Sequence, residues 1–177
     1  MFAFNKTYKL PFKYDVPNYT KEHLQKKNIY KRFLKFFKRY FYIVLKSQKN
    51  LEIFSILPSH QKILWINVSA PSFGDSLMDL SSRVLLLDRN IDLFTDVKNK
   101  HIYKDDEIFN NVFSQMKEMQ NIKYNLVILD SYSSRSIKVK SLIAPMTPYV
   151  GMFGYFNGPE VNRILFSFHQ MNNLLGS

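Results

Sequence analysis

Two stretches of the chain carry apolar residues in nearly unbroken runs, at the length expected for buried strands. Lys62 to Val68 is rich in Ile, Leu, Trp and Val, and Lys123 to Asp130 has the sequence KYNLVILD. Parallel strands that are covered on both faces show such runs with little alternation. Both stretches therefore predict strands near the centre of a parallel sheet.

Three weaker stretches predict the remaining strands. Asn90 to Asp96 predicts a strand, and Tyr149 to Tyr155 predicts the last one. Between them, His101 to Phe113 predicts a short edge strand followed by an acidic loop. The sheet is thus expected to have strongly apolar strands at its centre and less apolar strands towards its edges.

Helical patterns alternate with these strands. After Gly74, apolar residues recur at helical spacing, at Leu77, Leu80, Val84 and Leu87. Ile137 to Ala144 predicts a short helix, and a last helix is expected to begin at Gly158 and Pro159 and to be capped by Gly176. This alternation predicts an α/β fold, a Rossmann-like open parallel sheet flanked by helices with right-handed crossovers.

The amino-terminal part of the chain is strongly basic, whereas the rest is close to neutral. Residues 1–60 hold 13 Lys and Arg against 3 Asp and Glu, and residues 61–177 hold 12 against 11. We therefore divide the chain into a basic, aromatic extension, residues 1–60, and a Rossmann-like domain, residues 61–177. Within the extension, Lys21 to Lys46 predicts a basic amphipathic helix. Its apolar face comprises Ile29, Phe33, Phe36, Phe37, Tyr40, Phe41 and Val44, and its basic face comprises Lys31, Arg32, Lys35, Lys38, Arg39 and Lys46.

Three interpretations compete for this helix. Its aromatic face could pack on the domain while its charges face water. Alternatively, the helix could lie on an anionic membrane, with Lys31, Arg32, Lys35, Lys38 and Arg39 at the headgroups. Nucleic acid is disfavoured as a partner, because the aromatic side chains lie opposite the charges and could not stack on bases bound there. The first two interpretations stay open.

Composition excludes several other classes of protein. With 177 residues, 46% of them hydrophobic, the chain is long enough and apolar enough for one real core. The absence of cysteine excludes disulfides and thiolate metal sites, and suits a cytoplasmic protein. The four histidines show no metal-ligand spacing, so we expect neither a metal nor a cofactor.

Polar loops follow both central strands, and they form the candidate site. Ligands of open parallel sheets bind in the crevice at the carboxyl ends of the strands. The first loop and helix start supply Ser69, Ser72, Phe73, Gly74 and Asp75, and the second supplies Asp130, Ser133 and Arg135. Neither a dinucleotide-binding glycine motif nor a phosphate-binding loop is present in the sequence.

These two segments resemble glycosyltransferase family 9, the heptosyltransferases of bacterial lipopolysaccharide core synthesis. The first match comprises Lys62, Ile63, Leu64, Ile66, Ser69, Ser72, Gly74 and Asp75. The second comprises Tyr124, Leu126, Val127, Ile128, Asp130, Arg135 and Ser136. The resemblance covers roughly residues 62–175 and corresponds to the amino-terminal, acceptor-side half of a two-domain GT-B fold.

The resemblance implies an inverting, metal-independent transfer of heptose from ADP-heptose to a lipopolysaccharide core sugar. Asp75 would then be the general base that takes the proton of the acceptor hydroxyl, and Arg135 would contact anionic groups of the acceptor. Ser69, Ser72, Phe73 and Gly74 would shape the acceptor site, with Asp130, Ser133 and Arg135 across the crevice. From the residues alone, Asp75 is a helix-capping acid.

In such enzymes the second domain holds most of the sugar donor, so whether this chain is itself an enzyme stays open. A chain of this length is expected to be a truncated transferase that is inactive alone. The alternatives are a non-catalytic, membrane-associated binding module and one half of a split transferase with a partner chain. The expected partners are a lipopolysaccharide core or other sugar acceptor and an anionic membrane surface. The expected location is the cytoplasm, on the inner membrane if the basic helix binds lipid.

Overall fold

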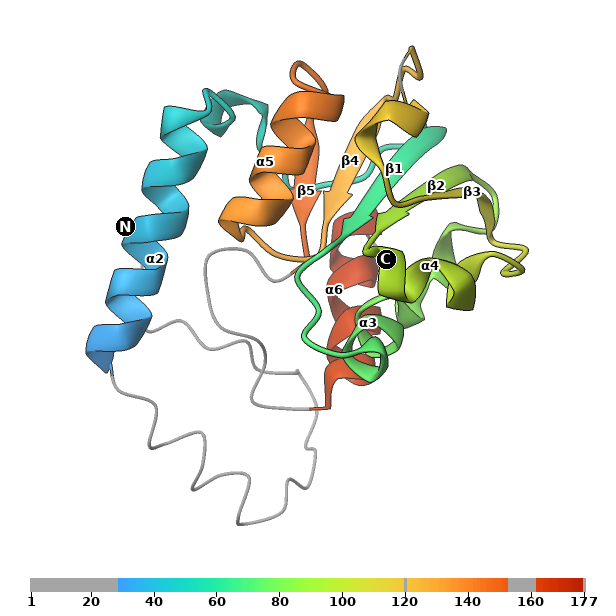
Figure 1. The fold of residues 1–177 in the computed structure, drawn as a ribbon, viewed down its shortest axis with the longest axis horizontal. Helices are drawn as coiled ribbons and strands as arrows, with labels where there is room; N and C mark the ends of the chain where they lie inside the picture. The colour runs from blue at the N-terminus through green and yellow to red at the C-terminus, as the bar shows by residue number, and fades with distance from the viewer. Residues whose placement is uncertain (1–28, 120, 153–161, 177) are drawn as a thin grey trace.

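The centre of the molecule is a five-stranded parallel sheet with the strand order β3-β2-β1-β4-β5 (Figure 1). The computed structural model describes residues 29–119, 121–152 and 162–176 of the chain. The strands are β1 Lys62–Asn67, β2 Asn90–Thr95, β3 Phe109–Phe113, β4 Leu126–Leu129 and β5 Tyr149–Gly151. The expected α/β fold, an open parallel sheet flanked by helices, is confirmed, and both apolar runs form central strands.

Five α-helices and three short 3-10 helices are described around this sheet. The α-helices are α2 Ile29–Leu45, α3 Phe73–Asp79, α4 Val97–Tyr103, α5 Ser134–Ile143 and α6 Arg163–Leu175. The 3-10 helices are η1 Lys49–Leu51, η2 Ser81–Leu86 and η3 Met116–Met119. Across the described ranges, no helix has both the length and the apolar character needed to cross a bilayer.

Two hydrophobic clusters lie on the two faces of the sheet, which gives a three-layer arrangement. Ile63 and Trp65 of β1 belong to the cluster that includes Phe166 of α6 and η2 side chains. Leu64 and Ile66 belong to the other, which includes residues of α2 and α5. Figure 1 shows α2 and α5 together on one side of the sheet, with α6 and α3 on the other. Because both faces of β1 are covered, its residues are apolar without alternation.

The segment after α2 is held to α5 by a buried lysine. Lys140 is fully buried, and its Nζ donates to Oε1 of Gln48 and, over 3.3 Å, to the carbonyl oxygen of Pro145. Burial lowers the pKa of Lys140 to about 8. The ammonium also lies 5.1 Å from the ring centroid of Tyr149 in β5, so it joins α2, α5 and the sheet at one point.

Two sequence predictions about local structure are wrong. The helix after Gly74 ends at Asp79, and the chain continues as η2. Leu87, the residue that follows η2, is 69% exposed. Serines that follow the helix favour this break, since Ser81 Oγ bonds back to the carbonyl oxygen of Met78 at 2.8 Å. The edge strand does not precede the acidic loop. Val97–Tyr103 is helical, and the strand Phe109–Phe113 follows the loop.

Helix ends differ from the sequence predictions as well. The last helix begins at Arg163, capped by Asn162, whose Oδ1 accepts from the amides of Ile164 and Leu165. The expected start at residues 158 and 159 lies outside the described residues, as do residues 21–28 of the first helix and residues 153–155 of the last strand. The C-cap at Gly176 is confirmed, with a left-handed φ of 78°.

Two glycines of the chain are expected to respond oppositely to alanine. A methyl group at Gly151 would overlap the buried ring of Tyr132, so Gly151→Ala should lower the free energy of unfolding by about 1–3 kcal/mol. A methyl group at Gly74 would meet Ser72 Oγ at 3.9 Å and nothing nearer, so Gly74→Ala should raise it by about 0.5–1 kcal/mol. Urea denaturation followed by circular dichroism measures both. Equal effects would contradict the packing described at β5.

Candidate functional site

The loops after β1 and β4 meet at the point where the strand order reverses. From β1 the chain builds outward to β2 and β3, whereas β4 and β5 lie on its other side. Ser69 Oγ lies 2.5 Å from Ser133 Oγ and 2.9 Å from Ser136 Oγ. The two segments that the sequence singled out are therefore in direct contact at the carboxyl edge, where open sheets bind ligands.

The buried side chain of Asp130 holds these two loops together through hydrogen bonds. It is buried, and its carboxylate accepts from the amide of Ser69 at 3.0 Å, the amide of Ser131 at 2.5 Å and the hydroxyl of Ser136 at 2.9 Å. Burial raises the pKa of Asp130 to about 6, although these donors favour the ionised form. Because these three donors come from both loops, Asp130 fixes the loops relative to each other.

A cavity of about 730 Å³ opens above these loops. Its lining comprises Val68, Ser69, Ala70, Pro71, Asp96, Val97, Lys98, Ser133, Ser134 and Arg135. Arg135 forms an ion pair with Asp96 and donates to the carbonyl oxygen of Val68 at 3.1 Å. Lys98 donates to the carbonyl oxygen of Pro71, also at 3.1 Å. Two cations thus stand at the rim of a cavity that contains serine hydroxyls.

The start of α3 is a capping box. Ser72 is the N-cap, its Oγ accepts from the amide of Asp75, and Asp75 Oδ2 accepts from the amide of Ser72 at 3.2 Å and from its hydroxyl at 2.7 Å. The capping role that the residues alone suggest for Asp75 is therefore confirmed. Gly74 sits within this turn of helix with room for a side chain, so its conformation does not demand glycine.

A second cavity, of about 380 Å³, lies beside the start of α3. Its lining comprises Ser72, Phe73, Lys98, Asn99, His101 and Ile102. Phe73 is 58% exposed. Asn99 is 1% exposed, and neither polar atom of its side chain has a hydrogen-bond partner within the described part of the chain. Buried amides without partners are rare in folded proteins, which marks Asn99 as unusual.

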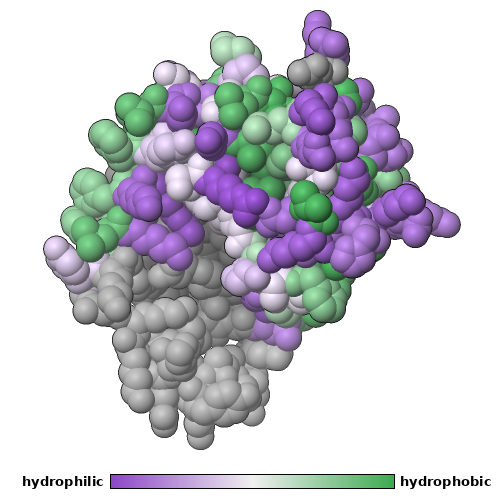
Figure 2. All heavy atoms as spheres, in the orientation of Figure 1, coloured by the Kyte–Doolittle hydropathy of each residue, from purple (hydrophilic) through white to green (hydrophobic). Residues whose placement is uncertain are grey.

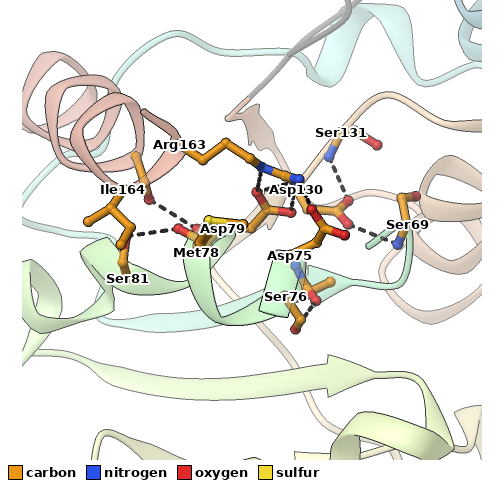
Figure 3. Close-up of polar contacts among 12 residues, drawn as sticks. Ser69, Asp75, Ser76, Met78, Asp79, Ser81, Asp130, Ser131, Arg163 and Ile164 are labelled. Carbon is orange, nitrogen blue, oxygen red and sulfur yellow. Dashed lines mark hydrogen bonds and ion pairs between the residues drawn. The ribbon is translucent and has the colours of Figure 1, made fainter. Parts of the chain in front are cut away.

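A cluster of ion pairs at this edge includes Arg163 and Asp79, which the sequence analysis did not assign to the site. Arg163, the first residue of α6, donates to Asp79 from Nε at 3.1 Å and from Nη2 at 2.6 and 2.7 Å. Arg163 Nη1 also pairs with Asp75 Oδ1. Figure 3 shows both carboxylates around the guanidinium, with Asp130 nearby. Asp75 and Asp130 therefore lie at the same edge, as predicted.

Burial, rather than the arginine, dominates the pKa of Asp79. Its side chain is only 4% exposed, and burial raises its pKa to about 7 in spite of Arg163, with Asp130 and Asp75 adding to the increase. One sequence signal pointed to Asp79, because it follows Asp75 by four residues and so shares its helix face. No comparable pattern marks Arg163, whose role depends on how α6 packs on α3.

This pKa shift predicts a particular pH dependence of stability. An acid whose pKa is raised on folding binds its proton more tightly in the folded state, so its contribution to stability falls as the pH rises. For Asp79 this fall spans the window from the ordinary value of 3.8 to about 7. Asp79→Asn cannot titrate, so the free energy of unfolding of the wild type minus that of the variant should decrease across this window. Urea denaturation at a series of pH values measures it, and an increase would mean that the attraction of Arg163 outweighs burial.

No family model and no curated protein matches the sequence. Among solved structures, that of the E. coli heptosyltransferase WaaC with ADP is similar to this chain, with a TM-score of 0.45 and 14% sequence identity. The match covers 64% of this chain and 47% of that chain, so the matched region is about half the length of that enzyme.

Proposed function

We propose that this chain is a glycosyltransferase-like domain that binds an acidic saccharide at the carboxyl edge of its sheet, and that sugar transfer requires a donor-binding partner. One observation carries the proposal. Ser69 and Asp130, from the two segments that resemble family 9, are 61 positions apart in the sequence, yet side chains of both segments line or support one cavity. The resemblance and the geometry thus point to the same place.

The chemistry of the larger cavity suits such a ligand. Its volume of about 730 Å³ is within the range of roughly 300–1,000 Å³ that is usual for small-molecule sites. The hydroxyls of Ser69 and Ser133 can donate to and accept from sugar hydroxyls. Arg135 has a side chain that is 63% exposed, and a guanidinium binds carboxylate or phosphate groups in a bidentate manner. An acidic sugar would take up both kinds of contact.

The smaller cavity supports the proposal with a different pair of groups. Phe73 offers an exposed ring, against which the apolar face of a sugar could pack. The amide of Asn99 is buried beside the same cavity without a partner among the described residues. A bound hydroxyl could satisfy such an amide, which can both donate and accept. Lys98 lines both cavities and would lie between two parts of a longer saccharide.

The environment of Asp75 supports binding without transfer by this chain alone. A general base must lie within about 2.6–3.2 Å of the hydroxyl whose proton it takes. Here one carboxylate oxygen of Asp75 pairs with Arg163, and the other accepts from Ser72. Because these contacts fill three of its roughly four acceptor positions, catalysis would be favoured if Asp75 exchanged one of these partners for the acceptor. The two forms of the proposal, a non-catalytic binding module and half of a split transferase, differ in whether a partner brings about this exchange.

Removing the guanidinium of Arg135 should weaken binding of an acidic saccharide. Arg135→Ala leaves Asp96 unpaired at the cavity, so binding of an acidic lipopolysaccharide-core oligosaccharide should weaken by about 10-fold, or ~1.4 kcal/mol. Isothermal titration calorimetry measures this, and Lys123→Ala is the matched control, an exposed lysine that precedes β4 at the other end of the strand. The fold should persist, since the Arg135 side chain is mostly exposed and ion pairs of exposed side chains contribute little to stability. Equal binding by both variants would remove Arg135 from the site.

The chain alone should not transfer sugar. Alignment of donor and acceptor can account for about 7–11 kcal/mol of a transfer barrier, and the proposal assigns the donor to a partner. Calorimetry should therefore show little or no binding of ADP or ADP-heptose, and incubation with ADP-heptose and acceptor should release no ADP. If the chain does release ADP and Asp75→Ala abolishes the release, Asp75 is a base after all and no partner is needed.

A further inference from the structure

Helix α2 buries only one narrow side against the domain. Phe36 is 5% exposed and Ile43 fully buried, and both belong to the hydrophobic cluster that α5 also enters. The ring of Tyr40 stacks on that of Phe36, with 6.0 Å between the centroids. At about 100° per residue, these three side chains lie along one line of the helix. Packing on the domain therefore accounts for part of the aromatic face, and the rest of that face needs another explanation.

A second side of α2 is apolar and exposed. We call it the apolar arc, and it comprises Leu34, Phe37, Phe41, Val44 and Leu45. Phe41 is 65% exposed and Leu45 is 63% exposed. At helical spacing the five side chains cover about a third of the circumference. In Figure 2, apolar side chains run along the outer edge of the molecule over α2, with hydrophilic side chains beside them.

The third side of α2 is basic and borders the apolar arc. Lys35 and Lys38 are exposed, Arg39 is half-buried, and Lys46 is exposed just beyond the end of the helix. The helix contains no acidic residue. For Lys31 and Arg32, which the sequence analysis placed on this side, the structure describes the backbone alone. Around α2, the order is thus a buried line, an apolar arc and a basic side.

We propose that the apolar arc of α2 inserts into the interface of an anionic lipid bilayer. A helix with large exposed apolar side chains, bordered by lysines and free of acids, complements acyl chains below and anionic headgroups above. The position of the domain fits this arrangement, because the centre of the arc lies roughly 140° around the helix from the Phe36–Ile43 line. With the arc in lipid, the sheet therefore stays on the water side. This surface is independent of the saccharide site.

The attachment of α2 to the domain gives the surface a fixed orientation. Phe36 and Ile43 pack into the core, and just after the helix the contact of Lys140 with Gln48 ties the chain to α5. A helix held at both places cannot rotate freely about its axis. The apolar arc therefore presents the same side to lipid in every molecule, and the domain adopts one orientation on the bilayer.

Vesicle co-sedimentation of the full chain tests the proposal. The protein should sediment with vesicles of phosphatidylcholine and phosphatidylglycerol, and much less with phosphatidylcholine alone. Raising the salt concentration should reduce the bound fraction, since screening weakens attraction to the headgroups. Binding to both kinds of vesicle that does not depend on salt would overturn the electrostatic part of the proposal.

Variants locate the contact on α2. Phe37→Ser combined with Phe41→Ser should lower the partition coefficient for anionic vesicles by at least about 10-fold, because two large apolar side chains no longer insert. The matched control is Phe54→Ser, which removes a side chain that is 76% exposed outside α2. Lys35→Gln with Lys38→Gln should also weaken binding, and the exposed pair Lys104→Gln with Lys123→Gln should not. A loss with both sets, or with neither, would overturn the assignment to α2.

A fluorescent probe distinguishes lipid from other occupants of the arc. The chain has no cysteine, so Phe41→Cys and, as control on α5, Leu142→Cys each accept one environment-sensitive label. Emission at position 41 should shift to shorter wavelength when anionic vesicles are added, while emission at position 142 should not. A short-wavelength emission at position 41 before any vesicle is added would show that a second copy or another segment of this chain covers the arc. That result would overturn the proposal.

Discussion

Asp79 lies beneath α6 with 4% of its side chain exposed, and the guanidinium of Arg163 offsets part of the cost of this burial. Removing a carboxylate from water costs several kcal/mol unless a well-placed partner replaces the lost solvation. Arg163 supplies three short contacts to Asp79 and reaches Asp75 with its remaining nitrogen. The start of α6 is thereby fixed against α3. Hydrogen bonds of Ser167 to Ser82 Oγ and to the carbonyl oxygen of Asp79 extend the contact of α6 with α3 and η2.

A second carboxylate is buried at the same edge, but neutral donors stabilise it instead of a cation. Asp130 is also buried, yet it accepts from backbone amides and a serine hydroxyl. Neutral donors orient a carboxylate without bringing a second charge into the interior. The serines that surround Asp130 thus remain fixed while Arg135 stays 63% exposed at the rim. In the proposed function, the acidic saccharide would contact an exposed cation above serines that are held in place by Asp130.

The features predicted from the sequence are those that depend on local pattern. Continuous apolar runs located β1 and β4, because both faces of these strands are covered, and Asp75, interpreted as a helix-capping acid, marked the start of α3. Prediction failed where a tertiary contact decides the local structure. Tyr103 belongs to a helix whose buried side faces α3, with its hydroxyl 2.8 Å from Ser76 Oγ, although its neighbours suggested a strand. Arg163 was missed for the same reason, since its partners lie on another helix.

The ion pair between Arg163 and Asp79 joins residues that are 84 positions apart. Contacts of such sequence separation form late, because the entropy of closing a long loop must be overcome before the contact contributes. During synthesis the amino-terminal parts of a chain emerge first, so α3 and most of the sheet can assemble before α6 is present. Until then, we expect the carboxylate of Asp79 to remain hydrated and the surface of α3 and η2 that α6 covers to remain exposed. We therefore expect docking of α6 to close both the core and the edge late in folding.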